Sequence, residues 1–162
     1  MRLPILAIIL VFTLAAPSSA ATIILVRHAE RAAAMTADAP LTPRGEERAR
    51  QLAAMLRDAN IRAVFTTEVR RTQQTAGPTA QEFHLRPSII PQKETNALLA
   101  RLKALPEGEA VLVVGHADTV PAIVQRLGGP LVPMKDDEYD RMVIVTTGGA
   151  KPSIITLRYG DR

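Results

Sequence analysis

The sequence predicts one α/β domain with a mostly parallel central sheet. Aliphatic runs alternate with segments of helical periodicity, which is typical of strands covered by helices on both faces. The clearest runs are 23–26, followed directly by Arg27, and 110–114, followed by Gly115 and His116. The whole chain has 162 residues, a length that suits a single hydrophobic core.

The first twenty residues predict a secretory signal peptide. Arg2 gives a positive start, residues 5–16 are almost continuously apolar, and small residues at 18–20 favour cleavage after Ala20. The apolar run is shorter than the ~20 residues that a membrane span needs, so we expect no stable membrane insertion after cleavage. The domain is predicted to occupy residues 21–162 and to be exported, to the periplasm or the medium.

Charge and composition exclude several classes of protein. Without the leader the chain carries a net charge of about +3, and many of its arginines cluster between residues 27 and 71, which favours a small anionic substrate. Nucleic-acid binding is not expected, because the chain has three Phe, two Tyr and no Trp to stack on bases. The absence of Cys excludes disulfide and thiol chemistry.

The first half of the domain is predicted to contain two strands with an amphipathic helix between them. The strands are 23–26, which leads into the polar residues at 27–30, and 61–67. The helix begins at Pro43 behind an N-cap at Thr42 and ends near Asn60. Its arginines are expected on a solvated face: Arg44, Arg48, Arg50 and Arg57. The segment 31–40 before it has no clear period and is expected to be a loop over the site.

Two more helices follow. One is predicted over residues 68–83, kinked or split by Gly77-Pro78, and the other over residues 95–105. The segment 85–91 between them contains two prolines, which confine it to a sheet edge or a loop.

The second half repeats the plan of the first strand. Residues 110–116 form an apolar run that ends in a histidine, and the helix after it is capped by Asp118 or Thr119. Residues 141–147 and 153–159 flank a Gly-Gly turn and are expected to close the chain as a hairpin.

Ionisable and hydroxyl side chains gather where the predicted strands end. Ligands of parallel sheets bind at the carboxyl ends of the strands, so these side chains are expected in one crevice. They are Arg27, His28 and Glu30 after the first strand, Thr67 and Arg71 after the second, and His116 and Asp118 after the strand at 110–116.

This combination of side chains suits a phosphoryl group. Guanidinium groups bind phosphate oxygens in a bidentate way and keep their charge near neutral pH. A neutral imidazole can attack phosphorus and form a phosphohistidine, which divides one displacement into two. A second imidazole, if protonated, would stabilise the transition state, and a carboxylic acid must protonate the leaving alkoxide.

Four motifs in this order resemble the histidine phosphatase superfamily, also called phosphoglycerate mutase-like. Arg27-His28-Ala29-Glu30 is similar to its Arg-His-Gly signature, and Leu41-Thr42-x-x-Gly45 precedes the amphipathic helix. Residues 67–76 stand in place of Ser-Pro-x-x-Arg-x-x-x-Thr-Ala, and Val114-Gly115-His116 ends the later strand. The resemblance covers residues 23–121 and implies a three-layer sandwich of the phosphoglycerate mutase-like type.

The resemblance also implies roles for the residues that end the strands. His28 would be the phosphorylated nucleophile, Arg27 and Arg71 would bind the phosphoryl group, and His116 would complete the pocket. Arg70 is the rival of Arg71, although the spacing within the motif favours Arg71.

Two further phosphate ligands are implied with departures from the family pattern. Thr67 stands where the family usually has Ser and keeps the hydroxyl. Arg31 falls where the acid phosphatase branch has an additional phosphate-binding Arg, but the Pro expected two residues later is absent.

The identity of the general acid stays open between three carboxylates. Asp118 lies just after the second histidine, as in the acid phosphatase branch, although one residue further on. Glu94 is its equal rival, because the mutase-like branch draws its Glu from the middle of the chain. Glu30 ranks behind them; it lies two residues beyond His28, as Asp118 does beyond His116.

The sequence therefore predicts a metal-independent phosphatase that hydrolyses phosphomonoesters of a small anionic substrate and needs no cofactor. The alternatives are a phosphohistidine protein phosphatase and a non-catalytic module that binds anions. A metal site is a further alternative, disfavoured because the two arginines would repel a cation. Its ligands would be His28, Glu30, His116 and Asp118.

Overall fold

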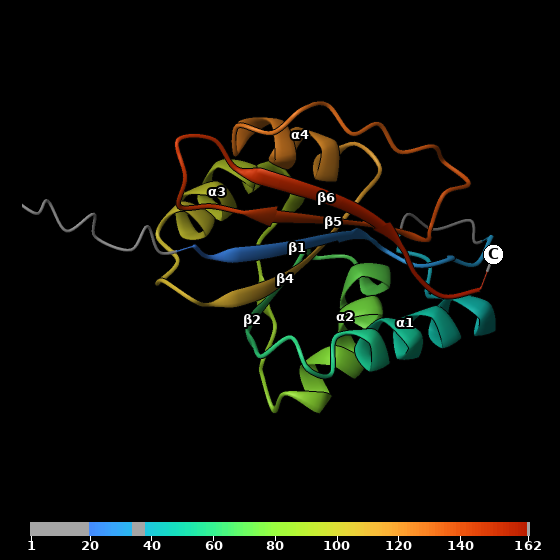
Figure 1. Cartoon of the computed structure of the whole chain (residues 1–162). Coiled ribbons are helices and arrows are strands. Elements are labelled where there is room, and N and C mark those ends of the chain that lie inside the picture. The colour runs from blue at the N-terminus through green and yellow to red at the C-terminus, as the bar shows by residue number, and fades with distance from the viewer. Residues whose placement is uncertain (1–19, 34–37, 162) are drawn as a thin grey trace, which may run out of the picture.

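A six-stranded sheet forms the centre of the domain (Figure 1). A computed structural model describes residues 20–33 and 38–161. The strands are β1 (Thr22–Arg27), β2 (Ile61–Thr66), β3 (Ser88–Ile89), β4 (Ala110–Gly115), β5 (Arg141–Thr146) and β6 (Ser153–Arg158). Their order in the sheet is β3-β2-β4-β1-β5-β6, and β1 to β4 run parallel while β5 and β6 form the antiparallel hairpin. The mostly parallel sheet predicted from the sequence is confirmed.

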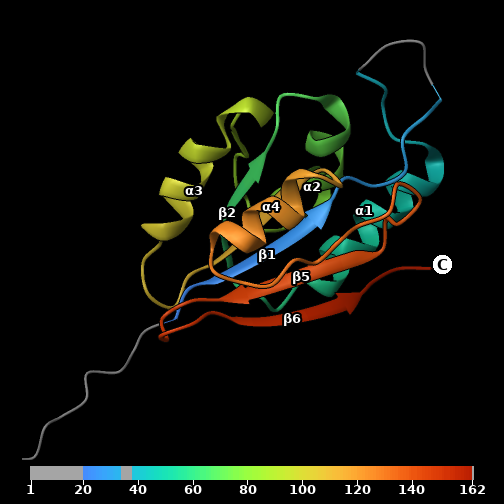
Figure 2. The same cartoon turned by 90° about the horizontal axis from the view of Figure 1, so that it is seen from above.

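Helices cover both faces of this sheet. They are α1 (Pro43–Met55), α2 (Arg70–Glu82), α3 (Thr95–Lys103) after a 3-10 turn at Gln92–Glu94, and α4 (Thr119–Arg126). Figures 1 and 2 show α1 and α2 on one face and α3 and α4 on the other. Ile23 and Leu25 of β1 pack in the core under α3 and α4, whereas Ile24 and Val26 pack under α1 and α2. This two-sided burial explains the uninterrupted apolar run of β1.

Some helix boundaries differ from the prediction. α1 ends at Met55, five residues before Asn60, which adopts a left-handed φ of 49°. α2 begins at Arg70 and continues through Pro78. The helix is not split there. Its buried face, which includes Thr75 and Ala76, packs along α1, and this packing offsets the loss of the backbone hydrogen bond that Pro78 cannot donate.

The predicted signal peptide lies outside the described residues, apart from Ala20. Its cleavage therefore stays a prediction. Within the part of the chain that the structure describes, no helix is long and apolar enough to cross a membrane.

The parallel strands bring their carboxyl ends to one edge of the sheet. β4 lies between β1 and β2, with Arg27 opposite Gly115 and Thr66 opposite Val114. The residues that follow these strands therefore leave the sheet side by side, as the sequence predicts.

Candidate active site

His28 is the first residue after β1 and is only 3% exposed. Its Nδ1 lies 2.8 Å from the carbonyl oxygen of Ala29. Because a carbonyl oxygen can only accept, Nδ1 carries the proton and Nε2 keeps its lone pair. Burial lowers the pKa of His28 to about 3, aided by the positive charges of Arg27 and Arg71, so the ring is neutral at pH 7.

His116 follows β4 and lies edge-on to His28. The two ring centroids are 5.4 Å apart, with an angle of 67° between the planes. Burial and the charge of Arg71 lower the pKa of His116 to about 4, against the opposite effect of Asp118 and Glu68. Both imidazoles are therefore neutral near pH 7. A bound phosphate dianion would raise the pKa of His116, because an opposite charge favours the imidazolium form.

A chain of hydroxyls orients the ring of His116. The Thr72 hydroxyl donates to the carbonyl oxygen of Val69 at 2.8 Å, and its oxygen lies 3.0 Å from Thr67 Oγ1. With the Thr72 proton used in this way, Thr67 donates to Thr72 and accepts from His116 Nε2 at 3.1 Å. Thr67 thus serves as an acceptor for the second histidine, and this hydrogen-bond pattern assigns the Nε2–H tautomer to it.

Arg27 is buried beneath the loop that precedes β5. Its Nη1 donates to the carbonyl oxygens of Lys135 at 2.9 Å and Asp136 at 2.7 Å, and the Tyr139 ring packs on the guanidinium at 4.2 Å. Its Nε is buried with no hydrogen-bond partner among the described residues. A phosphoryl oxygen would satisfy this donor.

Arg71, in the first turn of α2, lies close to both histidines. Its charge is one of the main causes that lower the pKa of each of them, and Arg70 is not among those main causes. Arg70 is exposed, and its backbone N–H donates to Asp38 at 2.6 Å. Burial and the charges of Arg31 and Arg27 in turn lower the pKa of Arg71, so three guanidinium groups gather here. The structure favours Arg71 over its neighbour.

Glu30 is directed away from the histidines and toward α1. Both of its oxygens accept from Arg48, at distances between 2.8 and 3.0 Å, and Arg44 contacts it at 3.2 Å. Burial alone would raise the pKa of Glu30, but these contacts outweigh it and keep the pKa below its usual value. Glu30 is thus a structural partner of α1, and the structure does not support it as the general acid.

The prediction of a solvated arginine face on α1 is wrong for Arg48. Its side chain is 4% exposed and also donates to the carbonyl oxygens of Tyr159 and Asp161. A single sequence does not show that Arg48 faces the end of β1, because the helical period places it on the border of the apolar stripe.

The other two candidate acids differ in their positions. Asp118 caps α4 and accepts from the side chain of Gln92 at 3.2 Å, and its charge acts on His116. Glu94 is exposed at the start of α3, and among the described residues its side chain has no hydrogen bond or ion pair with the histidine cluster. The structure therefore brings Asp118 to the site and leaves Glu94 apart from it.

Sequence reasoning missed Glu68 and Tyr139. Glu68 accepts from the backbone N–H of Gln92 at 2.8 Å and lines a cavity of about 540 Å³ together with Asp118. Hydrogen bonds from the backbone lower its pKa. Glu68 stands inside a recognised motif, where the family has Pro, whereas Tyr139 lies in a loop without any pattern.

Thr75 joins the segment after β1 to the start of α2. The Thr75 hydroxyl accepts from the N–H of Ala29 at 2.9 Å and donates to the carbonyl oxygen of Arg71 at 2.7 Å, which ties the two phosphate-binding segments together. Over residues 20–33 and 38–161, no three His, Cys, Asp or Glu side chains gather as metal ligands.

Comparisons with known proteins agree with this geometry. The model of the histidine phosphatase superfamily (branch 1) matches residues 23–95, which include β1, α1, β2 and α2. A comparison with curated proteins found no match.

Solved structures share the fold over almost their whole length. The protein histidine phosphatase SixA complexed with tungstate aligns with a TM-score of 0.69 at 23% identity, covering 85% of this chain and 96% of that one. A SixA from Nakamurella multipartitia, assigned as a phosphohistidine phosphatase, gives 0.61 at 25% identity, covering 90% and 98%. A mycobacterial glucosyl-3-phosphoglycerate phosphatase gives 0.66 at 11% identity, covering 86% and 98%.

Two buried imidazoles between arginines, at the strand ends of this three-layer sandwich, define a phosphatase of the histidine type. Over residues 23–95 the chain matches the histidine phosphatase superfamily, and its fold is shared by solved structures of phosphatases.

Proposed function

We propose that this protein hydrolyses phosphomonoesters through a phosphohistidine formed at Nε2 of His28. The observation that carries the proposal is the state of this ring: Nδ1 donates to a backbone carbonyl, and the low pKa keeps Nε2 unprotonated. A nucleophile with a free lone pair is what attack on phosphorus requires.

The first step transfers the phosphoryl group to the protein. His28 Nε2 attacks phosphorus, the bond from phosphorus to the ester oxygen breaks, and the leaving oxygen takes a proton from a carboxylic acid. Arg27, Arg71 and His116 would bind the three outer oxygens, with Arg31 at the rim. In the second step water attacks phosphorus and gives a proton to the carboxylate left by the first step, the P–N bond breaks, and Nε2 regains its lone pair.

Asp118 is the carboxylate that we propose as the proton donor. Asp118 and Glu68 both accept from Gln92, and the charges of both act on His116. The hydrogen bonds that Glu68 accepts keep it ionised, which suits an acceptor better than a donor. Glu94 does not line the cavity that Asp118 and Glu68 share.

The experiment that tests the mechanism is phosphate trapping. A brief reaction with a radiolabelled phosphomonoester, quenched in alkali, should leave label on the wild-type protein, and acid should release it. His28→Ala should show neither label nor turnover. Labelling of His28→Ala, or turnover in that variant, would refute the assignment, and tight binding of phosphate without turnover by the wild type would indicate the anion-binding module instead.

Export is part of the proposal and rests on residues 1–20 alone. N-terminal sequencing of the protein from a periplasmic or culture fraction should begin at Ala21. An intact Met1 would contradict cleavage.

A phosphohistidine protein phosphatase is the second candidate, favoured by the structural similarity to the two SixA proteins. Turnover of a phosphohistidine-containing protein should be compared with turnover of small phosphomonoesters. A kcat/KM that is higher for the protein substrate would favour this second function.

A further inference from the structure

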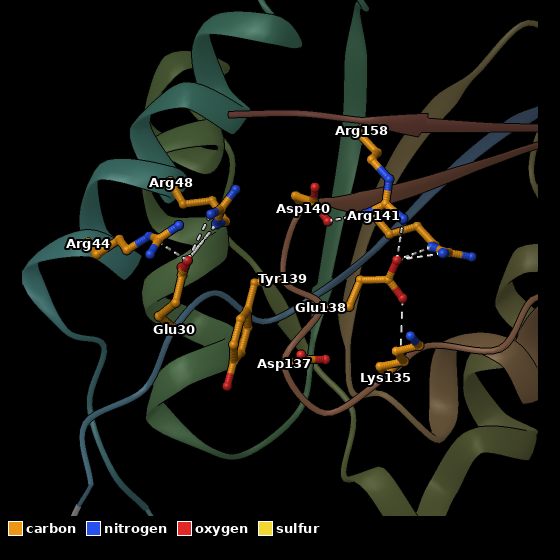
Figure 3. Close-up of a pocket in the computed structure, with 10 residues that line it drawn as sticks. All are labelled: Glu30, Arg44, Arg48, Lys135, Asp137, Glu138, Tyr139, Asp140, Arg141 and Arg158. Carbon is orange, nitrogen blue, oxygen red and sulfur yellow. Dashed lines mark hydrogen bonds and ion pairs between the residues drawn. The ribbon is translucent and has the colours of Figure 1, made fainter. Parts of the chain in front are cut away.

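Tyr139 lines a charged cleft of about 600 Å³ (Figure 3). The same residue lies next to the histidine pocket. The Tyr139 ring packs on Arg27, and its centroid is 6.1 Å from that of His28. The other residues that line the cleft are Glu30, Arg44, Arg48, Lys135, Asp137, Glu138, Asp140, Arg141 and Arg158.

Two groups of ion pairs form the walls on either side of Tyr139. On one side Glu30 is held by Arg48 and Arg44. On the other side Glu138 accepts from Arg141 and Arg158, and also from the backbone N–H of Lys135. Arg158 also pairs with Asp140. These contacts occupy most of the acceptor positions of the three carboxylates.

Hydrogen-bond donors remain available at the mouth of the cleft. The Arg44 side chain is 61% exposed, and only its Nε contacts Glu30. Lys135 is exposed, and within the described ranges its ammonium group has no hydrogen bond or ion pair. Asp137 is the lining carboxylate without such a partner in the same part of the chain. Arg44 and Lys135 thus supply two positive charges, and Asp137 supplies one negative charge. A ligand with acceptor oxygens and a negative charge would bind the donors that remain.

We propose that this cleft binds a second anionic group of the substrate, a carboxylate or a phosphate, while the reacting phosphate lies at His28. This inference rests on the proposed function. Tyr139 lines the cleft with its ring centroid 6.1 Å from that of His28. The carbonyl oxygen of Lys135 accepts from Arg27, so the cleft adjoins the phosphate pocket. A leaving group would extend from the reacting phosphate past Tyr139 toward Lys135 and Arg44.

The test compares two substrates of similar leaving-group acidity, 3-carboxyphenyl phosphate and 3-carbamoylphenyl phosphate. The wild type should favour the carboxylate by roughly fivefold in kcat/KM, as expected for a partly exposed charged contact. The double variant R44A/K135A should bring this ratio close to one. The matched control is Arg50→Ala, which removes an exposed arginine of α1 that does not line the cleft, and it should keep the wild-type ratio.

Equal kcat/KM values for the two substrates in the wild type would overturn the inference, as would a preference that survives in R44A/K135A. Turnover of phenyl phosphate reports on the proposed function separately. If the wild type does not hydrolyse phenyl phosphate, the cleft is tested by binding instead, from the Kd values of 3-carboxyphenyl phosphate and 3-carbamoylphenyl phosphate for His28→Ala. Tighter binding of the carboxylate, lost in R44A/K135A, would support the cleft, and equal Kd values would refute it.

Discussion

Gly45 lies against the backbone of Glu30, where the end of β1 meets the start of α1. A Cβ on residue 45 would come within 2.2 Å of the Glu30 carbonyl oxygen. That carbonyl accepts from the N–H of Thr42 at 2.9 Å, and the Thr42 hydroxyl accepts from the N–H of Gly45 at 3.1 Å. The Leu-Thr-x-x-Gly motif is thus a docking contact that sets α1 next to the catalytic segment.

Gly45→Ala should destabilise the protein by roughly 1–3 kcal/mol, because the contact is with backbone and one of the two segments must move. Turnover should fall as well, since the displaced segment continues into His28. Gly77→Ala is the matched control: it lies in α2 with nothing within 4 Å of the added carbon, and it should raise stability by about 1 kcal/mol. Urea unfolding of both variants checks this pair of effects, and equal stability of the two would contradict it.

Glu30→Ala should destabilise the protein by about 3–5 kcal/mol, since it leaves the buried guanidinium of Arg48 without its carboxylate. The matched control is Glu47→Ala, which breaks the pair with Arg50, in which both side chains are more than half exposed. That change should cost less than about 1 kcal/mol. Thermal unfolding measures both. A loss for Glu30→Ala as small as that for the control would show that Arg48 finds other partners.

The sequence predicts the sheet, the strand ends and the two histidines because they follow from periodicity and from motifs with fixed spacing. Arg48 and Tyr139 could not be found in this way. Their roles depend on the packing of α1 on the end of β1 and on the path of the loop 130–140, and both arise from contacts between segments far apart in the chain. The carboxylates fall between these cases, since the sequence supplies Asp118, Glu94 and Glu30 but only tertiary structure separates them.

Thr72→Val should lower kcat by roughly tenfold, because Thr67 loses the acceptor that fixes its hydroxyl and His116 then loses its orientation. Thr79→Val is the matched control on the same helix. Its hydroxyl is buried and has no hydrogen-bond partner among the described residues, so a methyl group should be neutral or stabilising. Steady-state kinetics on one phosphomonoester compares them, and equal kcat values would rule out the hydroxyl chain as a positioning device.

Stability should decline as the pH falls below about 6.5. The folded-state pKa of His28 is about 3 and that of His116 about 4. Between these values and pH 6.5 both histidines are protonated in the unfolded chain and neutral in the folded protein. Within this window each histidine lowers the free energy of unfolding by about 1.4 kcal/mol for every unit by which the pH falls. Its contribution to stability is fully present above pH 6.5. His28→Gln should flatten the slope by that amount between pH 6 and pH 5, as measured by urea unfolding. An unchanged slope would contradict the low pKa of His28.

Bound phosphate should raise the lowered pKa of His116 part of the way back toward its ordinary value. The ring is held below its ordinary pKa by burial and by Arg71, and a phosphate dianion in the pocket would supply the opposite charge. Titration of the histidine ring resonances by NMR should show the pKa of His116 rising from about 4 by at least about one unit at saturating inorganic phosphate. In Arg71→Gln the pKa without phosphate should already be higher, since a repelling charge is gone, and the phosphate-induced rise should be smaller, since a ligand of the anion is gone with it. If saturating phosphate left the pKa of His116 unchanged in the wild type, the anion would not lie next to this imidazole, and the second histidine would have no part in binding the phosphoryl group.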